Sequence, residues 1–428
     1  MTPEIKQRID AIRRGAVPEG YKKTINGIVP AQWSFVLLCE ILKKKLAKNV
    51  GNKIHNILTN SATEGIIRQT DYFDKKIAND DNTEVYYIVE QGDFVYNPRI
   101  SASAPCGPFN RYNGVEEGIM SPLYSVFSLK SDQLNSDFLK LYLRSTFWHK
   151  YMCSIANYGV RSDRMNVSNE DLLNLTLPAP VLREQQKIAE ILITQDKVIE
   201  LKEKRIAQKQ RQKKYLMQQL LTGKKRLKGF SGEWKKQKLS EVLKERKEKN
   251  VAEDLLICSV AVQKGVIGQI EHLGRSYAAT DTSNYSVVGF GDIVYTKSPT
   301  GDFPYGIIKQ SHIQDNVAVS PLYGVYIPVN YWLGYILHTY FQYAVNATNY
   351  LLPIVHKGAK NTINISNEVF LSNSLYLPMD EEEQKRISEL FIVVDREISL
   401  LQKDLEQEKL KKKALMQLLL TGIVRVSA

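Results

Sequence analysis

The chain has 428 residues, of which 43% are hydrophobic and 24% charged, so it can build packed cores and is not a disordered polymer. Its net charge of +12 and pI of about 9.2 favour an anionic partner, most commonly nucleic acid, although the excess charge can also serve solubility alone. The sequence has no run of eighteen apolar residues, no signal-peptide pattern at its charged N-terminus and no CxxC pair. These absences exclude a membrane span and predict a cytoplasmic chain without a zinc or disulfide framework.

An internal repeat organises the sequence. Three pairs of segments recur at a displacement of 199 positions (320 − 121, 291 − 92 and 415 − 216): residues 121–127 and 320–326, 92–96 and 291–295, and 216–223 and 415–422. Weaker matches at displacements of 198 (364 − 166), 200 (375 − 175) and 201 (234 − 33) fill the gaps in the same order. The chain is therefore a tandem duplication.

The repeat divides the chain into five parts. In chain order we predict a helical lead-in (1–20), a mixed domain (21–178), a long helix (179–224), a second mixed domain (225–378) and a second long helix (379–428). The predicted fold class is α+β, with β-rich domain cores and long helices that pair as an antiparallel coiled coil.

Short β-branched and aromatic runs bounded by turn residues predict the strands of the mixed domains. They fall at residues 85–89 and 93–96 in the first copy and at 292–295 and 324–327 in the second. A helix is predicted at 136–143, with Ser136 as its N-cap, and another at 331–341.

The long helices are predicted at 184–221 and 381–420, where no Gly or Pro occurs. Apolar residues at spacings of three and four mark a stripe on each helix, which we call the seam: Ile188, Leu192, Ile199, Ile206, Leu216 and Leu220 on the first, and Ile387, Phe391, Val394, Ile398, Leu401, Leu405, Leu415 and Leu419 on the second. Because Lys202 stands where the second seam has Leu401, the helices are expected to pair with each other rather than each with itself.

Such a helix can set a spacing. Roughly 38 residues span about 57 Å, which exceeds one turn of B-DNA, about 34–36 Å. Simple oligomerisation is the alternative for an apolar stripe of this kind. The spacing also predicts that charged residues at Ile188, Leu192 and Ile199 would prevent assembly and leave the mixed domains folded.

The two copies differ where the matched Gly-Asp-x-Val-Tyr strands end. Residues 97–101 and 296–300 share almost nothing, whereas the helical tails agree well. A duplicated scaffold could perform one task twice, but this distribution favours two sites that read different things.

No catalytic constellation is present. Residues 97–100 (Asn-Pro-Arg-Ile) come nearest to an amino-methyltransferase motif but lack its second proline and its aromatic residue. A phosphate-binding GxxxxGK[ST] loop is absent, and the six histidines include no HExxH or other close pair. We therefore predict no catalytic residue and no metal site.

Basic and amide side chains in predicted loops are the candidate DNA contacts. Arginine and lysine can bind guanine O6 and N7, asparagine can pair with adenine, and neighbouring cations hold phosphate. The candidates are Arg99, Arg111, Arg161, Arg164, Lys297, Lys357, Lys360 and Asn361. A basic tract over residues 202–228 is a further candidate, with a solvated helix face as the alternative.

Conserved-looking segments of the long helices resemble a known family. Glu-Gln-Gln-Lys-Ile-Ala-Glu-Ile-Leu (184–192) and Leu-Met-Gln-Gln-Leu-Leu-Thr-Gly (216–223), together with 383–387 and 415–422, are similar to the conserved regions of specificity subunits of type I restriction-modification systems. The opening Gly27 to Trp33 is also typical, and the resemblance covers essentially the whole chain.

The resemblance implies a non-catalytic, sequence-specific subunit with two target recognition domains, which reads a bipartite, asymmetric site in double-stranded DNA. The paired helices would act as a spacer and dock two methyltransferase subunits, and restriction/translocase subunits would join the complex. No cofactor is expected on this chain, because S-adenosylmethionine for adenine methylation, ATP and Mg belong to the partners. The alternative is a coiled-coil scaffold protein without sequence-specific DNA binding.

Overall fold

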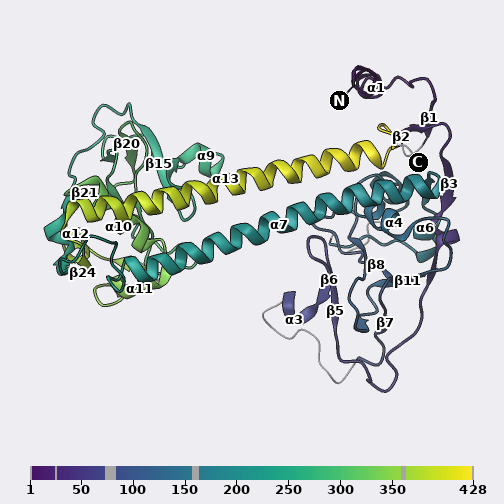
Figure 1. The fold of residues 1–428 in the computed structure, drawn as a ribbon, viewed down its shortest axis with the longest axis horizontal. Helices are drawn as coiled ribbons and strands as arrows, with labels where there is room; N and C mark the ends of the chain where they lie inside the picture. The colour runs from purple at the N-terminus through teal and green to yellow at the C-terminus, as the bar shows by residue number, and fades with distance from the viewer. Residues whose placement is uncertain (1, 25–26, 73–82, 157–162, 358–362, 427–428) are drawn as a thin grey trace. The chain divides into compact units, whose positions relative to one another are not determined.

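The computed structural model describes residues 2–24, 27–72, 83–156, 163–357 and 363–426 (Figure 1). The chain forms two compact units, the first made of Met1–Leu201 and Leu405–Ala428 and the second of Lys202–Asp404. Both long helices therefore contribute residues to both units. Within the described ranges, no helix is long and apolar enough to cross a membrane.

The first unit is built on short strands and a few short helices. Its elements are α1 (Pro3–Arg13), β1 (Tyr21–Thr24), β2 (Gly27–Pro30), β3 (Ser34–Leu37), α2 (Leu38–Ile41), β4 (Leu42–Lys44), β5 (Leu58–Ser61), β6 (Gly65–Arg68), α3 (Gln69–Tyr72), β7 (Tyr87–Val89), β8 (Phe94–Tyr96), β9 (Phe109–Arg111), β10 (Gly118–Met120), β11 (Ser125–Leu129), α4 (Ser136–Leu143), α5 (His149–Ile155), α6 (Asn169–Leu173) and β12 (Thr176–Ala179). The central sheet has the order β4-β11-β8-β9 and is antiparallel.

The second unit repeats this plan. Its elements are β13 (Lys235–Lys238), α8 (Leu239–Val242), β14 (Leu243–Glu245), β15 (Leu256–Ala261), β16 (Gly265–Gly268), α9 (Gln269–Leu273), β17 (Ser286–Val288), β18 (Ile293–Tyr295), β19 (Ile308–Gln310), β20 (Val317–Val319), β21 (Gly324–Pro328), α10 (Tyr331–Phe341), α11 (Ala344–Leu351), β22 (His356–Lys357), β23 (Ile363–Asn364), α12 (Asn367–Ser372) and β24 (Ser374–Leu377). Its sheet β14-β21-β18-β19 matches β4-β11-β8-β9 strand for strand. The predicted α+β class with β-rich cores is confirmed.

The two units share register as well as order. Tyr96 pairs with Phe109 in the first unit, and Tyr295 pairs with Ile308 in the second, each partner displaced by 199 positions (295 − 96 and 308 − 109). Large aromatic side chains fill both cores, Trp33 and Phe127 in the first and Tyr295 and Phe370 in the second. The duplication seen in the sequence is therefore a duplication of structure.

The long helices are α7 (Leu182–Leu220) and α13 (Glu381–Leu419), each of 39 residues. In the first unit, the Gln195 amide donates to Glu408 over 2.7 Å. In the second, Lys209 lies 2.9 Å from Glu397. Because the residue number on one helix falls as the number on the other rises, the helices run antiparallel, as predicted (Figure 1).

Charges on the facing sides match the two helices to each other. The pair Asp196–Lys412 in the first unit has its duplicate in Asp395–Lys213 of the second, with a nitrogen–oxygen distance of 2.5 Å in the latter. Lys202 also pairs with Asp404. In a self-pair of α7, Lys202 would face Arg205, which is the counterpart of Asp404 (404 − 199), so this pair favours the mixed helix pair over self-association of α7.

The seam residues turn inward, but not only toward the other helix. All fourteen are buried or half-buried. Ile188 and Leu192 are fully buried in the core of the first unit, and Ile387 and Phe391 pack with Tyr335 in the second. The expectation that charged residues at Ile188 and Leu192 would leave the domains folded is therefore wrong, because these side chains are part of a domain core.

Both predicted short helices are confirmed, and one predicted N-cap is wrong. The predicted helices at 136–143 and 331–341 coincide with α4 and α10. The N-cap of α4 is Asn135 rather than Ser136, because the Asn135 side chain accepts hydrogen bonds from the amides of Asp137 and Phe138.

Candidate nucleic-acid interface

Two equivalent hairpin loops present the residues that differ between the copies. The first loop (residues 97–108) joins β8 to β9, and the second loop (residues 296–307) joins β18 to β19. The Asn97 amide donates to the Pro108 carbonyl over 3.0 Å, and the Thr296 amide donates to the Ile307 carbonyl over 3.0 Å. Both loops are thus closed at their base by the same backbone contact.

A buried tyrosine holds each loop from beneath. The Tyr96 hydroxyl donates to the Cys106 carbonyl over 2.9 Å, and the Tyr295 hydroxyl donates to the Tyr305 carbonyl over 2.7 Å. Burial raises the pKa of both tyrosines, so both hydroxyls stay protonated donors at neutral pH. The two tyrosines are 199 positions apart (295 − 96), and so are the loop carbonyls that accept their hydrogen bonds (305 − 106).

Each loop also carries the same internal bridge and the same glycine. Ser101 bridges to Ala104, and Thr300 bridges to Phe303. Gly107 has φ +75° and Gly306 has φ +95°. A Cβ atom on Gly107 would lie 2.0 Å from the Asn97 carbonyl oxygen, so the backbone there passes too closely for any side chain. The two loops share one backbone design.

The exposed side chains of the loops differ in chemistry. Among polar side chains, the first loop exposes Arg99, Ser101 and Ser103, and the second exposes Ser298, Thr300 and Asp302. The sequence difference between residues 97–101 and 296–300 therefore lies on the outer face of a shared frame. A rigid frame with variable exposed polar groups is suited to reading different partners.

A second segment packs beside the first loop and brings two predicted residues together. The Ile100 amide donates to the Asp163 carbonyl over 3.0 Å, and the Met165 amide donates to the Pro98 carbonyl over 2.9 Å. Arg99 and Arg164 form an antiparallel bridge at this point. The Arg99 side chain is 68% exposed and its guanidinium lies 3.8 Å from the Asp163 carboxylate, a weak pair that a phosphate or base could replace.

Arg111 is placed differently from the prediction. It is the last residue of strand β9 and not a loop residue. Its guanidinium donates to Ser136 over 2.8 Å and to Asp137 over 2.6 Å, at the start of α4. A DNA contact by Arg111 stays a prediction, and it would require this ion pair to open.

Lys297 stands at the start of the second loop. Its φ of +52° is a left-handed conformation that non-glycine residues rarely adopt. Its ammonium donates to Asn367 Oδ1 over 2.6 Å, and the Asn367 amide donates to Glu245 over 2.5 Å. Burial lowers the pKa of Lys297. The side chain is tied to the scaffold beneath the loop.

The remaining candidates are only partly visible. Lys357 pairs through its backbone with Ile363 in the β22–β23 hairpin. The predictions for Arg161, Lys360 and Asn361 lie outside the described residues.

The basic tract of α7 has two faces. Lys202, Lys209 and Lys213 face acids of α13, whereas Arg205 and Arg211 are exposed. Three bases of the predicted tract therefore serve helix pairing, whereas exposed ones such as Arg205 and Arg211 can face an anionic partner. Within the described part of the chain, no group of three His, Cys, Asp or Glu side chains could hold a metal ion.

A buried carboxylate in each unit was not recognised from the sequence. Glu184, whose side chain is 1% exposed, forms two hydrogen bonds with Arg425, at 2.6 and 2.8 Å, and accepts one from the Trp33 indole at 3.2 Å. Glu383 has the same partners in the second unit, Arg226 at 2.6 Å and Trp234 at 3.3 Å. The signal was present, since glutamate, arginine and tryptophan all recur at 199 to 201 positions.

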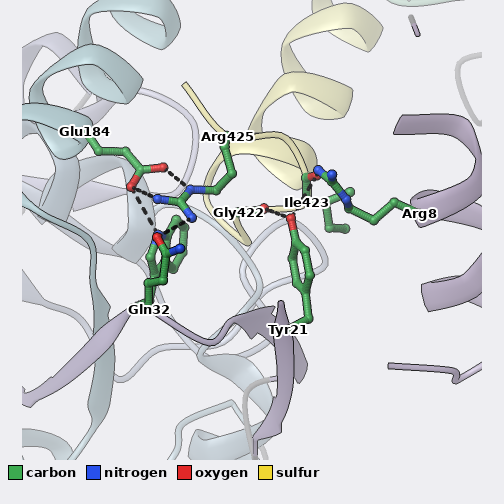
Figure 2. Close-up of polar contacts among 8 residues, drawn as sticks. Arg8, Tyr21, Gln32, Glu184, Gly422, Ile423 and Arg425 are labelled. Carbon is green, nitrogen blue, oxygen red and sulfur yellow. Dashed lines mark hydrogen bonds and ion pairs between the residues drawn. The ribbon is translucent and has the colours of Figure 1, made fainter. Parts of the chain in front are cut away.

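The C-terminal residues of the first unit are held by the N-terminal segment. Figure 2 shows Arg8 and Tyr21 donating to the carbonyl oxygens of Ile423 and Gly422, over 2.9 and 2.8 Å. Arg425 extends from the same stretch to Glu184 (Figure 2). Residues from both ends of the chain therefore complete this unit.

The chain is similar to proteins of one kind. Residues 36–211 match the family profile of the type I restriction modification DNA specificity domain. Over 95% of the chain, it is 26% identical to a putative type I restriction enzyme MjaX specificity subunit of Methanocaldococcus jannaschii, covering 97% of that protein. The MjaVIII specificity subunit of the same organism is 33% identical over 116 residues, and that match spans 27% of each chain.

Solved structures show the same fold. The S subunit of a type I restriction-modification system from M. genitalium matches with a TM-score of 0.55 and 13% identity, over 91% of this chain and 96% of that one. A chain from a study of complex assembly and conformational transition of the type I R-M system matches with a TM-score of 0.54 and 14% identity, over 92% and 99% of the two chains.

Proposed function

Since the chain belongs to the family of type I restriction-modification specificity subunits, we propose that it reads a split, asymmetric sequence in double-stranded DNA, one half with each unit. The family assigns it a role in DNA sequence recognition within a restriction-modification complex. The two-part, asymmetric target is the finer part of this proposal, and the family resemblance already implies it. One observation of the structure supports it, namely that the first and second loops share a backbone design and expose different side chains.

The first loop offers cations for base edges. Arg99 is exposed and lies beside Arg164 on the paired segment. Arginine can bind guanine in the major groove with two hydrogen bonds, and a neighbouring arginine can hold phosphate. Both loops expose hydroxyl groups, but the second exposes the Asp302 carboxylate where the first offers the Arg99 guanidinium, and a carboxylate suits other base edges. Two halves read by such different groups would not be identical.

The partners would carry the chemistry. We propose that this chain is non-catalytic, and that two methyltransferase subunits dock on the paired helices and bring S-adenosylmethionine for adenine methylation. Restriction/translocase subunits would bring ATP and Mg. The continuous 39-residue helices support a spacer role, because a single helix resists bending over its length.

Methylation mapping tests this proposal against a scaffold that binds no specific sequence. The chain is co-expressed with its methyltransferase subunit, and adenine methylation is mapped across the host genome with and without this chain. We expect methylation at one bipartite, asymmetric motif only when the chain is present. Methylation that is unchanged without the chain, or that follows no motif, would reject the proposal.

A point variant sharpens the assignment of the first loop. Arg99→Ala should relax one base of one half-site, with a loss of discrimination of about 1–3 kcal/mol. Arg386→Ala is a matched control, because Arg386 is also exposed and ion-paired, but on α13. Equal motifs for Arg99→Ala and the control would remove Arg99 from the reading surface.

A further inference from the structure

Lys309, on strand β19 of the second unit, is a buried cation that forms no ion pair with any described residue. As a whole residue, Lys309 is only 4% exposed to solvent. Among the described residues, none accepts a hydrogen bond from its ammonium group. The pKa of Lys309 is lowered to about 8, mainly by burial and also by the nearby Lys213, against a smaller opposing effect of Asp395. Burying an ammonium group without an ion-pair partner costs free energy of folding, which suggests that this lysine has a functional role.

The equivalent position of the first unit holds a neutral residue with hydrogen-bond partners. Register places Asn110 there, since Asn110 pairs with Val95 as Lys309 pairs with Val294. The Asn110 amide donates to Asn60 Oδ1 over 2.7 Å and to a backbone carbonyl over 3.1 Å. The position is therefore fully satisfied by its own unit.

The second unit also differs from the first at a residue that contacts Asn110 there. The β5–β6 and β15–β16 hairpins align at 200 positions, because Ser61 pairs with Gly65 as Ala261 pairs with Gly265. Val260 then stands in place of Asn60. The side chain that accepts a hydrogen bond from Asn110 in the first unit is therefore replaced by an apolar one next to Lys309, which leaves the ammonium available to another ligand.

A cavity of ≈ 520 Å³ opens in front of Lys309, wholly within the second unit. Its polar lining includes Lys213, Lys264, Lys309, His312, Tyr335 and Asp395. Asp395 is occupied, since Lys213 lies 2.5 Å from it and the Tyr335 hydroxyl donates to it over 3.2 Å. Lys264 at the rim stands where the first unit has Glu64, so an acid has been exchanged for a base.

The histidines of this region do not supply the charge. His338 Nδ1 accepts a hydrogen bond from the Gln310 amide over 2.9 Å, which requires that nitrogen to be unprotonated. Burial lowers the pKa of both His338 and His312, so both rings are neutral at pH 7. The uncompensated positive charge of the cavity therefore comes from Lys309 and Lys264.

We propose that this cavity is an anion site that binds a phosphate group, with Lys309 as its buried cation and Lys264 at its entrance. Lysine binds phosphate as a point charge, and phosphate oxygens can accept several hydrogen bonds at once. The site belongs to the second unit alone, because Asn110 fills the equivalent position of the first. The phosphate can come from a free phosphate compound or from the backbone of DNA, and both sources share this chemistry.

Thermal unfolding of the full chain tests the site with inorganic phosphate as the probe, against chloride at equal ionic strength. At ten times its Kd, phosphate should raise Tm by about 3–6 °C. Lys309→Met should fold and lose this shift, and Lys309→Arg should keep it. Lys236→Met, at an exposed lysine outside the cavity, is the matched control and should respond as the natural chain does.

A second variant protects the test against a folding defect at Lys309. Lys264→Glu, at an exposed rim position, should weaken phosphate binding at least threefold without changing Tm in chloride. The proposal is overturned if phosphate and chloride give the same Tm for the natural chain, or if folded Lys309→Met or Lys264→Glu keeps the full shift.

A duplex distinguishes the two phosphate sources. If the site holds a DNA backbone phosphate, a saturating duplex that carries the target should abolish the additional shift from inorganic phosphate. If it holds a free phosphate compound, the two shifts should add. Either result supports the site, which is independent of whether the loops read bases.

Discussion

Removal of Arg425 should expose how strongly the buried Glu184 depends on it. We consider Arg425→Met, because methionine keeps an apolar stem of similar length and removes the charge. Arg425 makes two of the three hydrogen bonds that Glu184 accepts, and the third comes from Trp33. The variant therefore leaves a carboxylate whose side chain is 1% exposed with a single neutral donor.

The expected loss follows from these contacts. Breaking a buried ion pair by removing one partner costs about 3–5 kcal/mol. Arg425 is 35% exposed, so water already screens the pair, and Trp33 keeps its hydrogen bond; both reduce the cost to about 2–3 kcal/mol. For a unit of roughly 200 residues, this corresponds to a fall in Tm of about 4–12 °C.

Urea unfolding monitored by tryptophan fluorescence and circular dichroism measures this loss. The double variant Glu184→Gln/Arg425→Met removes the buried charge as well and should recover most of the lost free energy of unfolding. Arg226→Met is the matched variant in the second unit, where the side chain of Arg226 is 22% exposed, and its cost should be at least as large. A cost below 1 kcal/mol for Arg425→Met, or no recovery in the double variant, would refute this reasoning.

Three further predictions concern single contacts. Burial raises the pKa of the Cys106 thiol to about 12, so this thiol stays protonated at pH 8. Iodoacetamide should therefore alkylate the exposed Cys153 but not Cys106. Equal labelling of the two cysteines in peptide mass spectra would contradict this prediction. Gly107→Val should disorder the first loop and abolish recognition of one half-site, because its Cβ would lie 2.0 Å from a carbonyl oxygen. Gly232→Ala, outside both loops, where φ is not positive and nothing lies within 4 Å of the added Cβ, should leave the methylation motif unchanged. Lys209→Glu should destabilise the pairing of α7 with α13 by about 1 kcal/mol, and by less at high salt. The double variant Lys209→Glu/Glu397→Lys should restore the lost stability. Equal urea midpoints for the natural chain and Lys209→Glu would argue against this ion pair.

Much of the fold can be predicted from the sequence because the chain contains an internal repeat. The recurrence of Gly-Asp-x-Val-Tyr at one displacement places β8 and β18, and the absence of Gly and Pro delimits α7 and α13. Local patterns were less decisive where two neighbours compete. Asn135 and Ser136 can both cap a helix, and the backbone conformation selects Asn135.

The candidate site depends on long-range register that no local pattern encodes. Arg99 and Arg164 are 65 positions apart (164 − 99), and two backbone hydrogen bonds, from Ile100 to Asp163 and from Met165 to Pro98, bring them together. Arg111 resembles any other basic residue in the sequence, and its pairing with Asp137 is visible only in the fold. Which of the candidate residues contact DNA bases stays a prediction.

The fourteen seam positions illustrate a different limit. Periodicity finds an apolar stripe but does not say what covers it. Ile188 belongs to a domain core, whereas Ile206 and Leu405 are buried on the long helices without belonging to the core of either unit. Variants meant to disturb only the helix pair should therefore use Ile206 or Leu405.

Exchange of one recognition domain tests the central claim most directly. Residues 21–178 are replaced by the equivalent segment of a specificity subunit with a different target, and adenine methylation is mapped with the methyltransferase subunit present. Independent reading by the two units predicts that one half of the bipartite motif changes, while the other half and the spacing between them stay the same. A change in both halves, or an unchanged motif, would contradict it.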